Sequence, residues 1–283
     1  AVTLTSILLA TVFFSYLFEL YLGLKQYSTP EEILIHIAPV GWVLVGLSMV
    51  ELLATFGVRF YATKFSEVKL SIQKLITLHY LMSNIRAIKG NQIIWFSIWG
   101  TAIFWGMSQN LVAVIPALAK ANLGVTSPLM VNAMLALSVI GIMVGAYVSA
   151  RKSVNSVKVN NIYTGSTTIT VCAILVPIVS ALGFIPNSTA LIIVSTLILL
   201  FGIGAGMMLV PLNALIQAHS AKDGLGNVLA GKNWIQNMAM IGLLLLTVLL
   251  AKSNVSSVYI LYLNALIAVV GFTIVLKRLK AIL

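Results

Sequence analysis

Eight runs of about 20 mostly apolar residues recur along this chain, and they restrict its fold more than any other feature. A helix of that length spans the hydrocarbon core of a bilayer. Hydrophobic residues make up 60% of the chain and charged residues 8%, whereas soluble domains contain about 25% charged residues. A lipid solvent accommodates this composition, because apolar side chains can then face outward. We therefore predict an all-α integral membrane protein with about eight transmembrane helices. The predicted spans are 1–21, 35–58, 92–118, 129–149, 161–183, 188–210, 228–250 and 255–276.

One of these boundaries is set by a turn signal. No charged residue occurs between Val159 and Ala221, so hydropathy alone does not divide this stretch. The sequence GFIPNS at 183–188 combines a glycine, a proline and an asparagine, which together favour a turn. We therefore predict two spans here rather than one.

The distribution of lysine and arginine predicts the orientation. Cytoplasmic loops of membrane proteins are enriched in these residues. If segment 59–91 is cytoplasmic and the spans alternate, all but three of the 17 basic residues fall on the cytoplasmic side. The three others are Lys25, Lys120 and Lys252. Both ends of the chain are then predicted to be cytoplasmic. Nucleic-acid binding requires a basic patch on a polar surface, and these charges instead lie in short tracts between apolar runs, so no nucleic-acid partner is expected.

Segment 59–91 is the longest polar connection in the chain. It is basic, and its apolar residues recur at a spacing typical of an amphipathic helix on a membrane surface. These residues are Val68, Ile72, Leu75, Ile76 and Met82. The segment separates two predicted spans from the following six.

Transporters of the major facilitator type have two six-span halves joined by a long cytoplasmic loop. If segment 59–91 is that loop, the first two spans are the fifth and sixth, and the chain corresponds to spans 5–12 of that fold. The predicted organisation is the last two helices of an N-terminal bundle at 1–58, a cytoplasmic linker at 59–91 and a six-helix C-terminal bundle at 92–283. This correspondence implies about four further spans upstream, and the start at Ala1 inside an apolar run agrees with that expectation.

Most of residues 90–240 resembles a known family. The matching stretches are GTAIFWG at 100–106, VNAM at 131–134 and VPLNALIQ at 210–217, followed by Gly226, Asn227, Asn233 and Asn237. In this order and spacing they resemble the bacterial lysophospholipid transporter family of the major facilitator superfamily. The resemblance implies a secondary transporter of the bacterial inner membrane, with membrane lipids and a small amphipathic substrate as partners.

Three positions depart from the family pattern. The resemblance implies an arginine that serves the lipid headgroup in the first span after the linker, and Val112 stands at that position. Where the family has a Gln-Asn and a Glu-Asn pair, this chain has Lys232-Asn233 and Gln236-Asn237. These changes bear on the substrate rather than on the fold.

Polar side chains within the spans are the candidate substrate contacts, because they are costly in lipid and usually face the interior of the bundle. Gln109 and Asn110 lie in the middle of a span, where their amides can contact a substrate or hydrogen-bond a neighbouring helix. Asn213 and Gln217 share one helix face after Pro211. That stretch is either a gate or the cytoplasmic end of a span.

A second polar group lies on the span at 228–250. Asn233, Gln236 and Asn237 are spaced so that they share one helix face, and Lys232 is adjacent to them. A lysine near the end of a span can extend its ammonium group back to the interface. The alternative is that Lys232 pairs with the anionic phosphate of a substrate.

Glu51 is the carboxylate within the second span. An intramembrane carboxylate is a candidate proton carrier, and it can equally pair with a lysine of a neighbouring helix. The glycines at 202, 204 and 206, and the pair at 141 and 145, are predicted to permit close helix packing.

Catalysis is not predicted. An acyltransferase His-x4-Asp pair is absent, since Asp223 is the only aspartate and lies one residue too close to His219. Cys172 is the only cysteine, which excludes a disulfide framework or a cysteine-rich metal site. We expect no enzyme activity, no cofactor and no metal.

The sequence thus favours a secondary transporter that moves an amphipathic substrate, with lysophospholipid as the first hypothesis. Two helix bundles would rock around a site near the middle of the membrane. A drug or siderophore exporter of the same superfamily, or a non-transporting membrane subunit of a larger complex, is the alternative.

Overall fold

The computed structural model describes residues 10, 13–14, 16–21, 29–57, 71–152, 159–221 and 224–283. Its helices are α2 (Pro30–Phe56), α3 (Ile72–Ile76), α4 (His79–Lys89), α5 (Gln92–Asn122), α6 (Pro128–Lys152), α7 (Val159–Ala181), α8 (Asn187–His219), α9 (Leu225–Lys252) and α10 (Ser257–Ile282). Seven helices in the described part are long and apolar enough to cross a membrane. These are α2 and α5 to α10, so the predicted all-α membrane protein is confirmed. The predicted span at 1–21 lies largely outside the described residues.

Local signals in the sequence set several helix ends. The Asn91 side chain accepts hydrogen bonds from the backbone N–H groups of Ile93 (2.9 Å) and Ile94 (3.3 Å), and so caps the start of α5. α7 ends at Ala181 and α8 begins at Asn187, so the predicted break at 183–188 is confirmed.

α8 is longer than its hydropathy predicted. The expected span ended at residue 210, but the helix continues through Pro211 to His219 and contains 33 residues. Proline removes a backbone N–H and leaves the carbonyl four residues earlier without its helical partner. Here that carbonyl belongs to Met207, and the Ser149 hydroxyl of α6 donates to it at 3.3 Å. The Asn161 amide of α7 donates to the same hydroxyl at 3.1 Å. Neighbouring helices thus satisfy the freed group, and α8 can continue.

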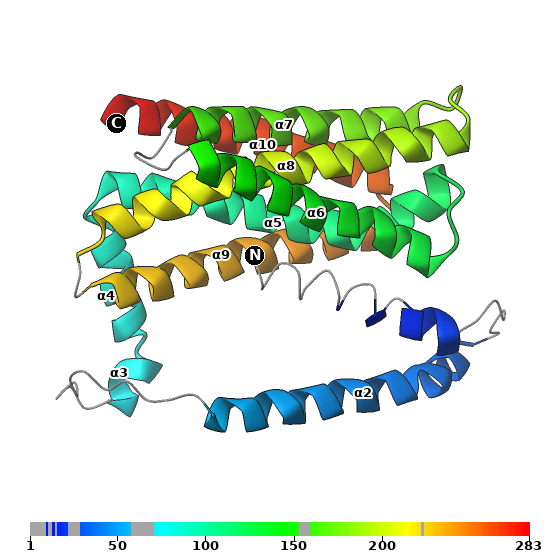
Figure 1. Cartoon of the computed structure of the whole chain (residues 1–283), viewed down its shortest axis with the longest axis horizontal. Coiled ribbons are helices and arrows are strands. Elements are labelled where there is room, and N and C mark those ends of the chain that lie inside the picture. The colour runs from blue at the N-terminus through cyan, green and yellow to red at the C-terminus, as the bar shows by residue number, and fades with distance from the viewer. Residues whose placement is uncertain are drawn as a thin grey trace.

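α8 lies at the centre of the six-helix bundle, between α6 and α7 (Figure 1). Glycines permit these contacts. A Cβ atom at Gly145 of α6 would overlap the backbone of Ile203, and one at Gly202 of α8 would overlap that of Ser138. Gly165 of α7 and Gly204 of α8 approach each other in the same way. The predicted small-residue packing surfaces are therefore present.

The basic ends of the helices gather at one end of the bundle. The starts of α5, α7 and α9 and the ends of α8 and α10 lie at the left of Figure 1, where α4 also lies. Lys89 and Lys280 belong to these ends, whereas Lys120 and Lys252 close α5 and α9 at the opposite end. The alternating direction of the spans agrees with the predicted charge asymmetry.

α4 runs across this end of the bundle, crosswise to the spanning helices (Figure 1). α3 precedes it, and Leu78 between them has a left-handed backbone (φ 54°). Ile88 of α4 is fully buried and reaches the first turns of α9, where a Cβ atom at Gly231 would overlap its Cδ1 atom. Residues 58–70 of the predicted linker lie outside the described residues.

α2 lies apart from the six-helix bundle in Figure 1. Most of its side chains are exposed, as Trp42 (76%) and Phe56 (80%) illustrate. Such an apolar helix surface requires lipid or further helices as neighbours. The division into 1–58, 59–91 and 92–283 remains a prediction.

Candidate functional site

The structure joins two of the predicted site residues across helices. The Lys232 ammonium group of α9 donates a hydrogen bond to Asn213 Oδ1 of α8 at 2.5 Å. The Asn213 Nδ2 group donates in turn to the Leu209 carbonyl one turn earlier on α8, at 2.8 Å. This second bond directs the amide oxygen towards the lysine. Lys232 and Asn213 are 19 residues apart in sequence, so the packing of α9 against α8 brings them together.

Lys232 is a half-buried cation with a neutral partner. Among the described residues, no carboxylate forms an ion pair with it. A cation in a desolvated setting is stabilised by a counter-charge. An amide oxygen supplies only a dipole, so the ammonium group remains available to an anionic ligand.

An open pocket of about 430 Å³ begins at Asn213. α8 supplies most of its wall, and α5 and α6 complete it. Its lining residues are Trp105, Ile142, Ala146, Gly206, Leu209, Val210, Asn213, Ala214 and Gln217. Asn213 and Gln217 are its polar residues, and the other side chains form an apolar surface. The pocket therefore offers both polar and apolar contacts, as an amphipathic ligand requires.

Gln236 lies one turn after Lys232 on α9. Its side chain is only 7% exposed, and its Nε2 group has no hydrogen-bond partner among the described residues. Ser97 of α5, which is fully buried, likewise has a hydroxyl oxygen without a partner in that part of the chain. Buried polar groups without partners are uncommon and cost about 1–3 kcal/mol each. Gln236 thus retains a free donor on the helix that carries Lys232.

Asn110 forms a contact between two helices. It is buried (1% exposed), and its Oδ1 atom accepts a hydrogen bond from the Thr247 hydroxyl of α9 at 2.6 Å. This bond joins α5 to α9, so the helix–helix alternative describes the observed contact. Gln109 is half-buried next to it.

The remaining predicted residues are not gathered at the Lys232–Asn213 pair. Asn233 and Asn237 are exposed on α9. Glu51 is exposed on α2, which lies apart from the bundle (Figure 1). Val112 on α5 is 49% exposed, so its position faces outward from the six described bundle helices.

The sequence did not predict two residues that the structure places at the pocket or in the contact between α5 and α9. Trp105, at the edge of the pocket, lies in the GTAIFWG stretch but was not selected as a contact. Thr247 looked like an ordinary residue of an apolar span, and its partner Asn110 is 137 residues away. A search for every polar side chain within a span would have found Thr247.

Comparison with known proteins supports the family resemblance. The chain is 34% identical over 169 residues to the lysophospholipid transporter LplT of Salmonella arizonae, which covers 57% of this chain and 39% of that protein. It is 35% identical over 150 residues to the LplT proteins of Salmonella paratyphi B and Salmonella newport, covering 52% of this chain and 34% of theirs. No family model matches the chain. No solved structure matches it either.

The chain thus spans between a third and two fifths of the length of these curated relatives. All three are named as transporters. The resemblance carried by the GTAIFWG and VPLNALIQ stretches is confirmed, since this multi-pass membrane protein is similar over about half its length to curated bacterial lysophospholipid transporters.

Proposed function

We propose that this chain is part of a secondary transporter of the bacterial inner membrane that moves lysophospholipids between leaflets by alternating access. The half-buried Lys232, hydrogen-bonded to Asn213 and without a carboxylate partner in the described chain, carries this proposal. A lysophospholipid has a phosphate group and one acyl chain. The ammonium group pairs with the phosphate, and the apolar pocket beside Asn213 accommodates part of the acyl chain.

Each residue of the proposed site has a separate role in binding the substrate. Lys232 Nζ binds a phosphate oxygen, and Asn213 holds the ammonium group in place before the ligand arrives. Gln236 supplies a further N–H donor from the same helix. Trp105, Ile142 and Leu209 contact the acyl chain. Transport requires only binding and a change of access, so we propose no catalytic step.

The proposal includes an orientation. We propose that the end of the bundle that carries α4 and the end of α10 faces the cytoplasm, since basic residues are concentrated there. Lys232 lies about two turns after the start of α9, which is at this end of the bundle. The substrate headgroup would thus bind on the cytoplasmic side of the membrane centre.

The test is uptake of labelled lysophosphatidylethanolamine by spheroplasts that lack their own lysophospholipid transporter and express this protein from its complete reading frame. A charge-assisted hydrogen bond contributes about 1.5–3 kcal/mol, so Lys232→Ala should weaken apparent affinity about ten- to a hundred-fold. Lys232→Arg keeps the charge and should retain part of the uptake.

Lys252→Ala is the matched control, because it removes a lysine at the opposite end of the same helix. It should transport normally at equal protein level. If the unmutated protein moves no lysophospholipid, the substrate assignment is wrong and the exporter alternative replaces it. If transport occurs and Lys232→Ala is as active as the control, the headgroup role of Lys232 is wrong.

A further inference from the structure

A second pocket lies on the outer surface of the bundle, where α4, α5 and α9 meet. Its volume is about 440 Å³, and three tryptophans line it: Trp95 and Trp99 of α5 and Trp234 of α9. Ile85 and Lys89 of α4 close one side. This pocket shares no lining residue with the pocket beside Asn213.

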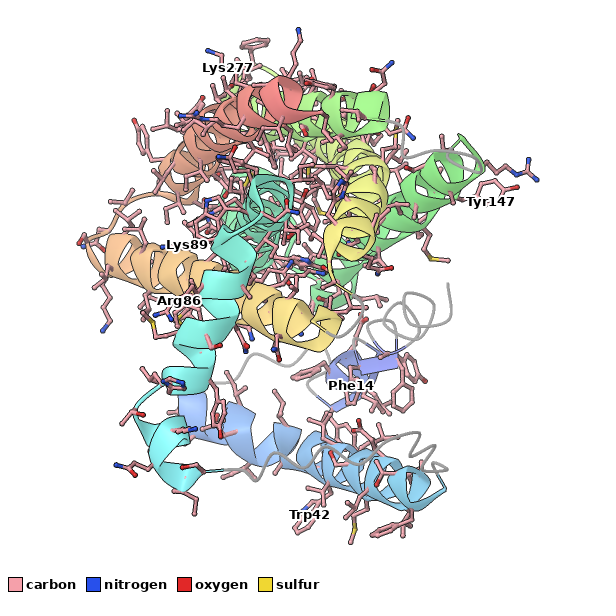
Figure 2. All side chains as sticks on the ribbon, turned by 90° about the vertical axis from the view of Figure 1, so that its left-hand side faces the viewer. Phe14, Trp42, Arg86, Lys89, Tyr147 and Lys277 are labelled. Carbon is pink, nitrogen blue, oxygen red and sulfur yellow. The ribbon has the colours of Figure 1, made fainter. Side chains whose placement is uncertain are left out.

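Lys89 gives this pocket a positive charge. Its ammonium group lies 5.4 Å from the centre of the Trp95 ring, as in a cation–π contact. Arg86 lies one turn earlier on α4, and the sequence of that helix contains no acidic residue. Figure 2 looks onto this end of the bundle and shows both side chains on α4, at the end of the molecule that also carries Lys277. The Trp95 ring covers one side of the ammonium group, and N–H donors on the other side can bind an anion.

The tryptophans lie near the ends of the spanning helices, where lipid headgroups are expected. Trp95 falls in the first turn of α5, and Trp99 follows one turn later. Trp99 and Trp234 are 40% and 39% exposed. Tryptophan is enriched where a membrane span meets the headgroup region, and lysine near the surface attracts anionic lipid. The combination fits the headgroup of an anionic lipid.

An apolar groove continues from the same tryptophans further along α5. It has a volume of about 340 Å³ between α5 and α10, and Trp95, Trp99, Ile103, Gly271 and Ile274 line it. Its surface is apolar almost throughout, unlike the pocket at Lys89. A headgroup at Lys89 and an acyl chain in this groove would belong to one molecule.

We propose that the α4–α5–α9 pocket binds an anionic phospholipid of the surrounding bilayer, with its phosphate at Lys89 and an acyl chain in the α5–α10 groove. This lipid is a resident ligand rather than the transported substrate, so the site does not depend on the proposed function. Its headgroup would contact α4 together with α5 and α9, and would thereby hold α4 against the bundle.

The chain offers a direct probe, because three of its five tryptophans line the pocket. When Trp42, Trp105 and every tryptophan encoded outside residues 1–283 are replaced by phenylalanine, the remaining fluorescence comes from Trp95, Trp99 and Trp234. The purified full-length protein is reconstituted in phosphatidylcholine nanodiscs that contain increasing fractions of phosphatidylglycerol with brominated chains, which quench nearby tryptophans. Brominated phosphatidylcholine provides the comparison.

Quenching should reach half its maximum at a lower fraction of phosphatidylglycerol than of phosphatidylcholine. Lys89→Gln should raise the required phosphatidylglycerol fraction about fivefold, as expected from losing one basic residue near a membrane surface. Lys89→Arg should preserve the preference. Lys74→Gln on α3 is the matched control, since it removes an equal charge outside the pocket and should change nothing.

Three results would overturn the proposal. Equal quenching by both lipids in the unmutated protein would mean that no anionic headgroup is recognised, and this measurement needs no Lys89 variant. An unchanged preference in Lys89→Gln would remove Lys89 from any such site. Inorganic phosphate at millimolar concentration should not relieve the quenching; relief would assign the site to free phosphate instead of lipid.

Discussion

At the scale of single residues, the polar side chains within the spans divide into two groups. Asn110 and Thr247 are hydrogen-bonded to each other, and the Thr247 hydroxyl also lies 2.8 Å from the Leu243 carbonyl. Lys232 has only a neutral partner, and Gln236 has a donor without a partner in the described chain. The first group joins helices, and the second is available to a ligand.

The Asn110–Thr247 bond should therefore affect stability rather than transport. Hydrogen bonds between membrane helices contribute about 0.6 kcal/mol on average, with a maximum near 1.7. We predict a coupling energy in this range for a double-mutant cycle of Asn110→Leu and Thr247→Val, measured by unfolding of the purified protein. Zero coupling would show that the bond contributes nothing, and lost transport in folded Asn110→Leu would indicate a substrate contact.

Glu51 makes a separate prediction. It is exposed on α2, a helix whose composition places it in the membrane. A carboxylate in lipid needs a proton or a partner charge, so Glu51→Gln should reduce lysophospholipid transport while the protein level stays constant. Glu31→Gln, at the first turn of the same helix, is the matched control. Full transport by Glu51→Gln would show that the carboxylate is not required.

At the scale of elements, the contact between α6 and α8 is the closest in the bundle. Gly145→Ala should destabilise the protein by about 1–3 kcal/mol, because the added methyl group overlaps the Ile203 carbonyl. Thermal unfolding of the purified protein would measure this loss. Gly242→Ala on α9 is the control, since nothing lies within 4 Å of its Cβ position. Equal stability of both variants would contradict the packing described here.

The helices of the bundle were largely predictable, and their mutual contacts were not. Each predicted span from 92 to 276 coincides with a helix, because about 20 apolar residues can hardly do otherwise in lipid. Asn213 and Gln217 were expected on one helix face, but the predicted span ended at residue 210, because the sequence does not show that the Ser149 hydroxyl of another helix supports an unbroken α8 to His219. The Lys232–Asn213 contact depends on how α8 and α9 are rotated against each other, and no local pattern encodes that rotation.

At the scale of the whole molecule, the direction of each span leads to a labelling prediction. In a Cys172→Ser background, Gln73→Cys on α3 and Ala281→Cys on α10 should react with a membrane-impermeant maleimide only after spheroplasts are permeabilised. Thr126→Cys, in the exposed turn between α5 and α6, should react in intact spheroplasts. Labelling of position 73 or 281 from outside would reverse the proposed orientation.

The position of α4 has a mechanical consequence for the whole molecule. This helix of 11 residues is fixed to α9 by Ile88 at Gly231, immediately before Lys232. A helix transmits force along its axis as a short rod does, whereas an extended tether only limits distance. Any displacement of the chain before His79 would thus push or pull on the turn of α9 that carries Lys232. α4 would then act as a lever on the proposed headgroup site.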